Sequence, residues 1–304
     1  MNFVATVLPR LALGLLISSL IGLVAYRRGS LSRSGVLGAV MTGTTIFGFG
    51  GFTAGVLLVA FFVSSSLLSH FKQNNQQKQR AAEMFDKGGQ RDLGQALANG
   101  GAAAVFAVIG SVGVMWLFEN RKASAESTML ISNVWSGSMA AVVGALATVN
   151  ADTWATELGV LSKTKPRLIT NPFRAVEPGT SGGVSFIGLL AALAGAVFIS
   201  MVFVIGRWGM SALSPLSFSQ SIFVACTLGG FLGSLFDSFL GATAQAIYYS
   251  NQRQKETEKA IEKDGTPNKL IRGWKWLNND WVNFISSVIG ALVAALLVTL
   301  ISNL

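Results

Sequence analysis

The sequence predicts an all-α, polytopic integral membrane protein, and three observations carry that prediction. Of the 304 residues, 51% are hydrophobic and only 12% are charged, whereas soluble proteins carry about 25% charged residues. The apolar residues gather in eight long runs separated by polar connections. The basic residues are concentrated in every second connection, which is typical of a chain that crosses a bilayer repeatedly.

A helix needs roughly 20 residues to cross the hydrocarbon core, and most of the eight apolar runs are about that long. We expect a retained first helix and no signal peptide, because Tyr26-Arg27-Arg28 follows the first run in place of a small-residue cleavage site. The second run is Gly-rich and short, which fits a re-entrant or half helix. The runs cover 4–25, 35–50, 52–70, 94–118, 129–149, 184–205, 218–244 and 281–302.

The basic residues predict which connections face the cytoplasm. Four of the 23 lysines and arginines lie on one side of the predicted bundle, at Arg10, Arg121, Lys122 and Arg207. All the others lie in the connections that alternate with these, so the positive-inside rule puts the N-terminus outside and those connections in the cytoplasm. The net charge of +9 is therefore accounted for by basic residues that face the cytoplasmic side of the lipid bilayer, and it does not indicate a nucleic-acid partner.

The polar connections predict local elements within a single membrane domain, 1–304. Its motif-bearing core covers about 68–287, and the N-terminal helices cover 1–67. The connection 71–92 suits a short helix, and the stretch 252–263 suits another that stops near Asp264-Gly265. With one histidine, His70, and one cysteine, Cys226, the chain has too few such residues for a histidine-based zinc site or a Ser-His-Asp triad.

Acidic residues inside or beside apolar runs are the first candidates for chemistry. Asp237, followed by Ser238, lies within an apolar run, where an ionisable group is costly and is a functional candidate by default. Asp152 and Glu157 lie five apart at the end of another run. On a helix Asp152 shares a face with Thr156, whereas Glu157 points elsewhere. The structural alternatives are a salt bridge, or a protonated acid bonded to a neighbour, at Asp237 and a helix cap at Asp152.

The connection from Asn150 to Gly188 holds an unusual density of charges and glycines. Its turn, Pro178-Gly179-Thr180-Ser181-Gly182-Gly183, precedes an apolar run, and such a turn can cradle a phosphate with backbone N–H groups. The alternative is a turn that only begins the next helix. The other candidates of this connection for phosphate or nucleotide binding are Asn150, Thr153, Lys163, Lys165, Arg167, Arg174 and Glu177.

Further polar candidates stand at the predicted ends of other runs. Asp92, Gln95 and Asn99 fall on one helix face at the start of a run. Asp280 and Asn283 open the last run, and Gln245 follows Asp237 near the end of its run. Helix capping explains Asp92 and Asp280 equally well.

Several motifs together resemble one integral-membrane family, the phytyl-phosphate kinase and transmembrane-protein-19-like family, a former domain of unknown function. They are RDLGQALANG, NADTWATELG, PRLIT, VEPGTSGGVSFIG, FDSFLGATAQ and NDWVNFISS. The resemblance implies a kinase that transfers a phosphoryl group from a nucleoside triphosphate, CTP or ATP, to a prenyl monophosphate such as phytyl, geranylgeranyl or farnesyl phosphate. Prenyl-lipid metabolism, of which tocopherol synthesis is one branch, is then the implied setting.

The implied chemistry fits the candidate residues. Mg²⁺ prefers carboxylates together with phosphate oxygens, which predicts a magnesium site at Asp152, Glu157 and Asp237, with Arg174 as a catalytic phosphate clamp. A prenol kinase or a cytidylyltransferase of the same superfamily is the nearest alternative. A membrane transporter is the alternative from another class. The sequence leaves open the prenyl chain length, the nucleotide and whether the protein forms a homo-oligomer.

Overall fold

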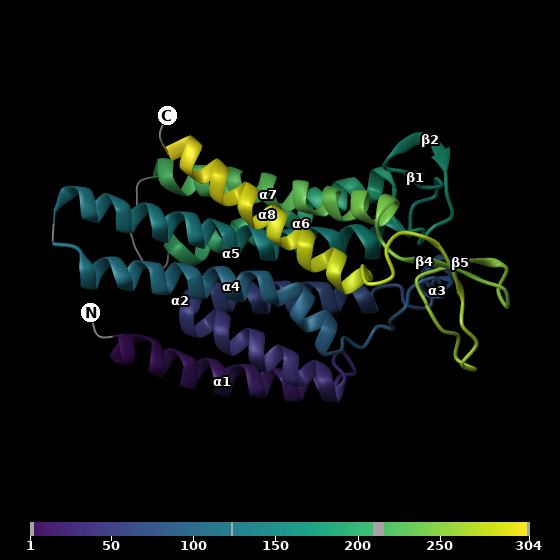
Figure 1. Cartoon of the computed structure of the whole chain (residues 1–304), viewed down its shortest axis with the longest axis horizontal. Helices are drawn as coiled ribbons and strands as arrows, with labels where there is room; N and C mark the ends of the chain where they lie inside the picture. The colour runs from purple at the N-terminus through teal and green to yellow at the C-terminus, as the bar shows by residue number, and fades with distance from the viewer. Residues whose placement is uncertain (1–2, 123, 209–215, 303–304) are drawn as a thin grey trace.

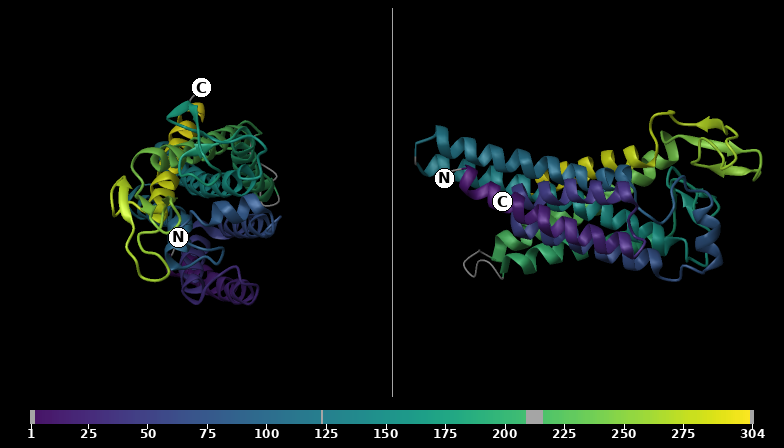
Figure 2. Two further views of the ribbon diagram at one scale, coloured as in Figure 1. Left: turned by 90° about the vertical axis from the view of Figure 1, so that its right-hand side faces the viewer. Right: turned by 90° about the horizontal axis from the view of Figure 1, so that it is seen from below.

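The computed structural model describes residues 3–122, 124–208 and 216–302. It confirms the all-α, polytopic prediction, because seven helices in this part of the chain are long and apolar enough to cross a membrane. They form a bundle with both termini at one end and the strands at the other (Figure 1; Figure 2). The helices are α1 Phe3–Arg27, α2 Arg33–His70, α3 Gln76–Ala82, α4 Leu93–Asn120, α5 Ala125–Gly159, α6 Phe186–Trp208, α7 Leu216–Thr243 and α8 Asn279–Ser302.

Helix α2 joins two of the predicted runs, 35–50 and 52–70, and folds back on itself between them. The bend is at Gly51, whose φ of 76° and ψ of −173° are non-helical. A Cβ on Gly43 would lie 3.8 Å from Leu58 Cδ2, although a straight helix would separate these residues by about 22 Å. The halves therefore pack against each other as a hairpin, which accords with the expectation of a re-entrant segment at 35–50.

Helix α5 is the central element of the bundle. Every residue from Met139 to Ala151 is buried, and alanine and glycine allow α6, α7 and α8 to approach closely, as is usual in membrane bundles. At 35 residues the helix is about 52 Å long, longer than the hydrocarbon core of about 30 Å. Its last two turns, which carry Asp152 and Glu157, therefore extend toward the connections.

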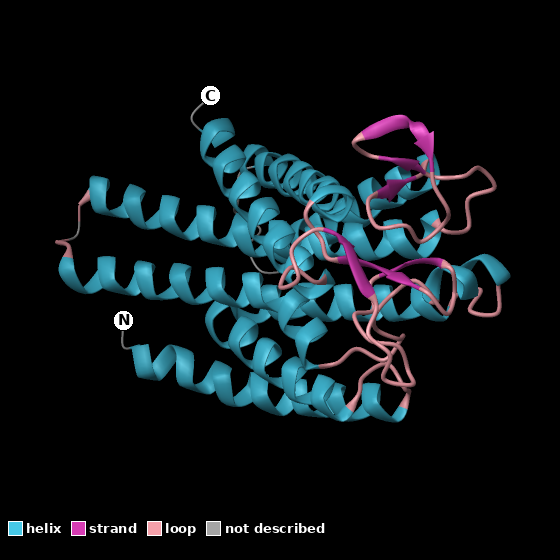
Figure 3. Ribbon diagram, turned by 45° about the vertical axis from the view of Figure 1, so that its right-hand side comes forward, coloured by secondary structure: helices cyan, strands magenta, loops and turns pink. Residues whose placement is uncertain are grey.

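The four basic connections lie at the same end of the bundle, where two small antiparallel sheets form (Figure 3). One sheet has the order β2-β1-β3 and the other the order β5-β4-β6. The strands are β1 Arg167–Leu168, β2 Asn171–Ala175, β3 Gly183–Val184, β4 Ile247–Ser250, β5 Lys255–Thr257 and β6 Lys269–Arg272. We refer to this region as the loop end.

The short helix expected in 71–92 is confirmed as α3, whereas the helix expected over 252–263 is wrong. Residues 255–257 instead form β5, which pairs with β4. The long connection 244–278 also binds 71–92, because Lys255 Nζ lies 2.6 Å from Glu83 Oε2 and Glu258 N donates to Met84 O. Contacts between two distant connections outweighed the local helical pattern, and sequence periodicity does not report such contacts.

Candidate functional site

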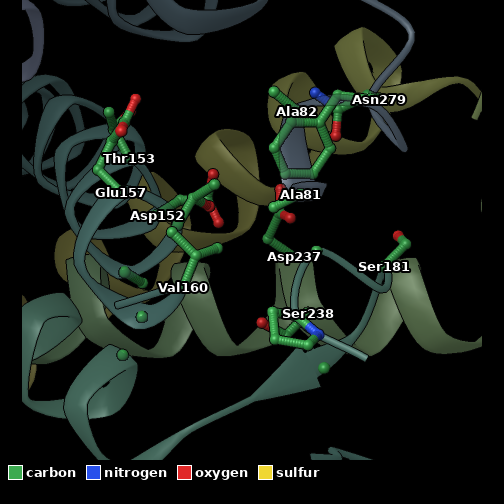
Figure 4. Close-up of a pocket in the computed structure, with 18 of the residues that line it drawn as sticks. Ala81, Ala82, Asp152, Thr153, Glu157, Val160, Ser181, Asp237, Ser238 and Asn279 are labelled. Atoms are coloured by element: carbon green, nitrogen blue, oxygen red, sulfur yellow. The ribbon is translucent and has the colours of Figure 1, made fainter. Parts of the chain in front are cut away.

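A cavity of about 610 Å³ lies at the loop end. Its walls come from the end of α2, α3 and the chain after it, the starts of α4 and α8, the ends of α5 and α7, and the turn 178–185. Figure 4 shows Asp152, Asp237, Ser238 and Glu157 among its lining side chains. Connections that are far apart in sequence thus enclose one polar space above the helix bundle.

Asp152 and Asp237 are brought together by the packing of two parallel helices. Helices α5 and α7 both run toward the loop end, and a Cβ on Gly233 of α7 would meet the Thr148 hydroxyl of α5. Asp152 and Asp237 each stand four residues, or about one turn, after this contact. The close approach allowed by glycine therefore sets the two carboxylates side by side at the cavity floor.

The two aspartates form an electrostatically incomplete pair. Asp237 Oδ2 is buried and makes no hydrogen bond of ordinary geometry with the described residues. The Ser286 hydroxyl favours the charge on Asp237, whereas the Asp152 charge acts against it. Two adjacent, partly buried carboxylates repel each other, and a cation between them stabilises both as anions. Mg²⁺ suits them, because it binds one or two carboxylates and completes its shell with water and phosphate oxygens. In the described residues no three acidic, histidine or cysteine side chains form a metal cluster.

Glu157 lines the same cavity but is held by protein groups. Its Oε2 lies 2.6 Å from Lys78 Nζ, and its Oε1 accepts a hydrogen bond from Ser69 at 2.6 Å. Lys78 Nζ also donates to the carbonyls of Leu68 and Phe71 at 2.8 Å. The structure therefore gives Glu157 a role in fixing α3 to the ends of α2 and α5, apart from the Asp152 and Asp237 pair.

A second cation, Lys87, lies between the starts of α4 and α8. Lys87 Nζ forms ion pairs with Asp92, at 2.9 Å, and with Asp280. Asp92 also caps α4, because its side chain accepts from Gln95 N and the Gln95 side chain accepts from Asp92 N. Burial lowers the pKa of Lys87, but the hydrogen bonds to Asp280 and Asp92 outweigh it, and the net shift is upward. Lys87 therefore remains protonated.

The glycine turn lines the cavity and is also tightly packed. Gly179 and Gly182 have φ of 92° and 80°, which favour glycine. A Cβ on Gly182 would meet the backbone of Ala242 in α7. Within the turn, Thr180 N donates to Glu177 O and Gly183 N donates to Thr180 O. These two N–H groups therefore already have acceptors within the turn. The positive φ values and the close packing against α7 account for the glycines at 179 and 182.

A chain of hydrogen bonds links the glycine turn to the second sheet. Ser181 Oγ donates to Gln245 Oε1 at 2.6 Å, and Gln245 Nε2 donates to Glu258 Oε1 at 2.9 Å. Burial raises the pKa of Glu258 to about 7, and the bond from Gln245 opposes that shift. Glu258 lines the cavity but lies in the stretch 252–263, which the sequence predicted only as a helix in a polar connection, so it was not among the candidates.

The bases of the central connection lie away from the cavity walls. Arg174 is exposed on β2, and Arg167 Nη1 donates to Pro172 O in the same small sheet. Lys163 is exposed, and Lys165 pairs with Glu177 at 2.6 Å on the surface. Among the described residues the lining cations are instead Lys78, Lys87 and Arg91. In the sequence Lys78 and Lys87 were only two bases of the connection 71–92, whereas Arg91 begins the motif RDLGQALANG.

The remaining polar candidates divide into two groups. Asn150 is fully buried away from the cavity, where it accepts from Ser64 Oγ at 2.9 Å and donates to Gly195 O at 2.8 Å, so it ties α5 to α2 and α6. The others line the cavity, where Thr153 Oγ1 bonds to its own helix at Val149 O. This group consists of Gln95, Asn99, Thr153, Thr156, Ser238, Asp280 and Asn283.

Fold and site together define a class: a polytopic α-helical membrane protein with a cavity of carboxylates and cations among the connections at one end. The chain belongs to the family of integral membrane proteins DUF92, which matches residues 16–291.

Curated relatives span nearly the whole chain. Protein PGR of Arabidopsis thaliana is 36% identical over 94% of this chain and 96% of its own length. An uncharacterized membrane protein of Methanocaldococcus jannaschii is 29% identical over 95% of each chain. Protein VTE6, chloroplastic, of Arabidopsis thaliana is 25% identical over 88% of this chain and 65% of its own length. No solved structure matches the chain.

Proposed function

We propose that this protein is a prenyl-phosphate kinase, which transfers the terminal phosphoryl group of a nucleoside triphosphate to a prenyl monophosphate. The observation that carries the proposal is the cavity itself. It combines two half-buried carboxylates without a compensating cation, Asp152 and Asp237, with the cations Lys78, Lys87 and Arg91. The resemblance of the motifs to the phytyl-phosphate kinase family gives the same answer.

The reaction requires little from a protein base. The second pKa of a phosphate monoester is about 6, so the acceptor is largely a dianion at neutral pH. Its oxygen bonds to the terminal phosphorus as the bond from that phosphorus to the bridging oxygen breaks, which leaves a nucleoside diphosphate and a prenyl diphosphate. Positioning and charge neutralisation provide most of the catalysis of such transfers, and a site without histidine suits them.

The residues divide between metal and phosphate binding. We assign Mg²⁺ to Asp152 and Asp237, where it would neutralise charge on the nucleotide phosphates. We assign Lys87 to attracting phosphate oxygens, whereas Lys78, whose three N–H donors are already bonded, holds α3 against the bundle. We assign the loop end to the cytoplasm, because the positive-inside rule favours that side and nucleotides are available there.

Product analysis tests the proposal. The purified protein in lipid nanodiscs would receive Mg²⁺, CTP or ATP, and either a prenol or a prenyl monophosphate. We expect a prenyl diphosphate and a nucleoside diphosphate, formed only with Mg²⁺. Phosphorylation of the prenol alone would identify a prenol kinase instead. A CDP-linked lipid with release of inorganic diphosphate would identify a cytidylyltransferase.

A further inference from the structure

A second cavity, of about 230 Å³, lies within the helix bundle next to the first. It is enclosed by α1, both halves of the α2 hairpin and the first turns of α4. Nearly all of its surface is apolar, and Phe52 and Val56 at its edge are exposed on the outside of the bundle. In a membrane that edge faces lipid, so a hydrocarbon chain can enter the cavity from the side.

The polar and the apolar cavity meet at two residues, Arg91 and Asn99, which line both. Arg91 is fixed at the junction by its backbone, because Arg91 N donates to Ser30 O at 3.1 Å and Ser32 N donates to Arg91 O at 3.0 Å. This parallel bridge joins the start of α2 to the start of α4. The junction is therefore a defined position in the fold and is not set by a freely moving side chain.

The Arg91 guanidinium is charged and incompletely bonded. Its Nη1 is buried and has no hydrogen-bond partner in the described part of the chain. Its Cζ lies 5.5 Å and 5.6 Å from the ring centres of Phe61 and Phe62, which stabilise a cation but accept no strong hydrogen bond. Burial lowers the pKa of Arg91 to about 10, so the group remains protonated at neutral pH. The carboxylate that acts on it, Glu157, is already bound by Lys78.

We propose that the apolar cavity holds the hydrocarbon chain of a prenyl monophosphate and that Arg91 binds its phosphate at the junction of the two cavities. The proposal rests on the proposed function for the identity of the acceptor. A buried cation with unused donors fits a phosphate dianion, which a guanidinium can bind with two parallel hydrogen bonds. The headgroup would then face the aspartates while the chain lies between α1 and α2.

A matched pair of variants on α2 tests the chain site. Val59 lines the apolar cavity, whereas Val63, one turn further on, is exposed and outside it. Val59→Trp should raise KM for geranylgeranyl phosphate by about tenfold or more, equivalent to about 1.4 kcal/mol, and should affect a five-carbon phosphate much less. Val63→Trp should change neither. If Val59→Trp misfolds, Ala39→Leu provides a smaller obstruction. An equal effect on short and long chains would overturn the proposal.

A second matched pair tests the phosphate contact. Arg91→Lys keeps the charge but loses the two-bond geometry, so affinity for a prenyl phosphate should fall by about tenfold, while affinity for the corresponding prenol should not change. Arg28→Lys, at an exposed arginine of the loop end, is the control. Equal losses for phosphate and alcohol would show that Arg91 only supports the fold, and would overturn its assignment.

Photo-crosslinking separates this inference from the proposed function. A prenyl phosphate with a diazirine on its terminal isoprene should label residues of the α1 and α2 hairpin lining, and unlabelled prenyl phosphate should compete. That result stands even if no phosphoryl transfer occurs, in which case only the proposed function fails. Labelling elsewhere in an active kinase would overturn the inference. Equal competition by phosphatidic acid would identify a bilayer phospholipid site only and would also overturn it.

Discussion

Lys78 Nζ lies 2.6 Å from Glu157 Oε2, and this ion pair joins the short loop helix α3 to the end of the central helix α5. The Lys78 side chain is only 8% exposed and that of Glu157 23%. Removing one partner of such a pair leaves a poorly solvated charge. The contact is therefore expected to control how firmly the connection 71–92 covers the cavity.

Lys78→Met should lower the free energy of unfolding by roughly 1–3 kcal/mol, because Glu157 loses the cation that also donates a hydrogen bond to its Oε2. The double variant Lys78→Met with Glu157→Gln should recover part of the loss, since no charge is then left unpaired. A double-mutant cycle from thermal unfolding in detergent measures the coupling, which should exceed about 0.5 kcal/mol. Strictly additive losses would mean that the ion pair contributes nothing.

Asp152→Asn and Asp237→Asn should each reduce turnover by roughly 100-fold or more, because charge stabilisation in a buried site is a large part of such catalysis. The folded protein should remain as stable or become more stable, since an amide removes the repulsion between the two carboxylates. The stabilisation of the protein by Mg²⁺ in a thermal-shift assay should disappear. Asp264→Asn, at an exposed position, is the control, and full activity of either variant would remove that aspartate from the metal site.

Much of the fold was predictable because helices in a membrane leave a strong signal. Each predicted apolar run lies, apart from a residue or two at its ends, in a helix of the structure. The short Gly-rich run at 35–50 is the first half of the α2 hairpin. The helix predicted over 252–263 was wrong because the conformation of polar segments at the loop end depends on contacts with other connections. Arg253 Nη1, for instance, donates to Glu83 O at 2.8 Å, far away in sequence.

For the candidate site, sequence reasoning identified residues but not their partners. Asp152 and Asp237 stood out because a charge in an apolar run is costly wherever it points. Arg174 looked equally suitable, yet it lies on an exposed strand, while Arg91 and Lys78 line the cavity. All three belong to basic connections at one end of the bundle. Contacts between distant segments decide which of them point inward: the docking of α3 for Lys78, and the bridge to Leu31 for Arg91.

The sidedness of the loop end is tested by cysteine labelling. In a Cys226→Ala background, Lys165→Cys and Lys259→Cys should react only with a reagent on the cytoplasmic side, because the basic connections favour that side. Arg121→Cys, beyond the end of α4 at the opposite end of the bundle, should react only from the other side. Labelling of Lys165→Cys from outside would contradict a site that uses cytoplasmic nucleotides.

Gly51 is predicted to be essential for the α2 hairpin. Its φ of 76° and ψ of −173° lie in a region that other residues adopt only at a cost of about 1–3 kcal/mol. Gly51→Ala should therefore lower Tm and loosen the apolar cavity. Gly137→Ala is the matched control, because Gly137 is helical with nothing within 4 Å of an added Cβ, and alanine should stabilise that helix by up to about 1 kcal/mol. Equal Tm values for Gly51→Ala and the wild type would mean that the bend does not need glycine.

The last prediction concerns the pH dependence of stability at Glu258. Burial raises its pKa from 4.5 to about 7 in the folded protein. Below about pH 4.5 both folded and unfolded states hold the proton, and the group costs nothing. As the pH rises toward 7 the unfolded state loses the proton first, so stability falls with rising pH and the full cost is reached above 7.

Glu258→Gln imitates the protonated side chain at every pH. The difference in Tm between this variant and the wild type should therefore change in favour of the variant as the pH rises from 5 to about 7, and should level off by pH 8. Differential scanning fluorimetry in detergent, in steps of half a pH unit, measures it. A constant difference over that range would mean that Glu258 titrates alike in the folded and unfolded states. Its hydrogen bond to Gln245 would then hold a carboxylate that is ionised throughout, and the cavity would carry one more negative charge beside Asp152.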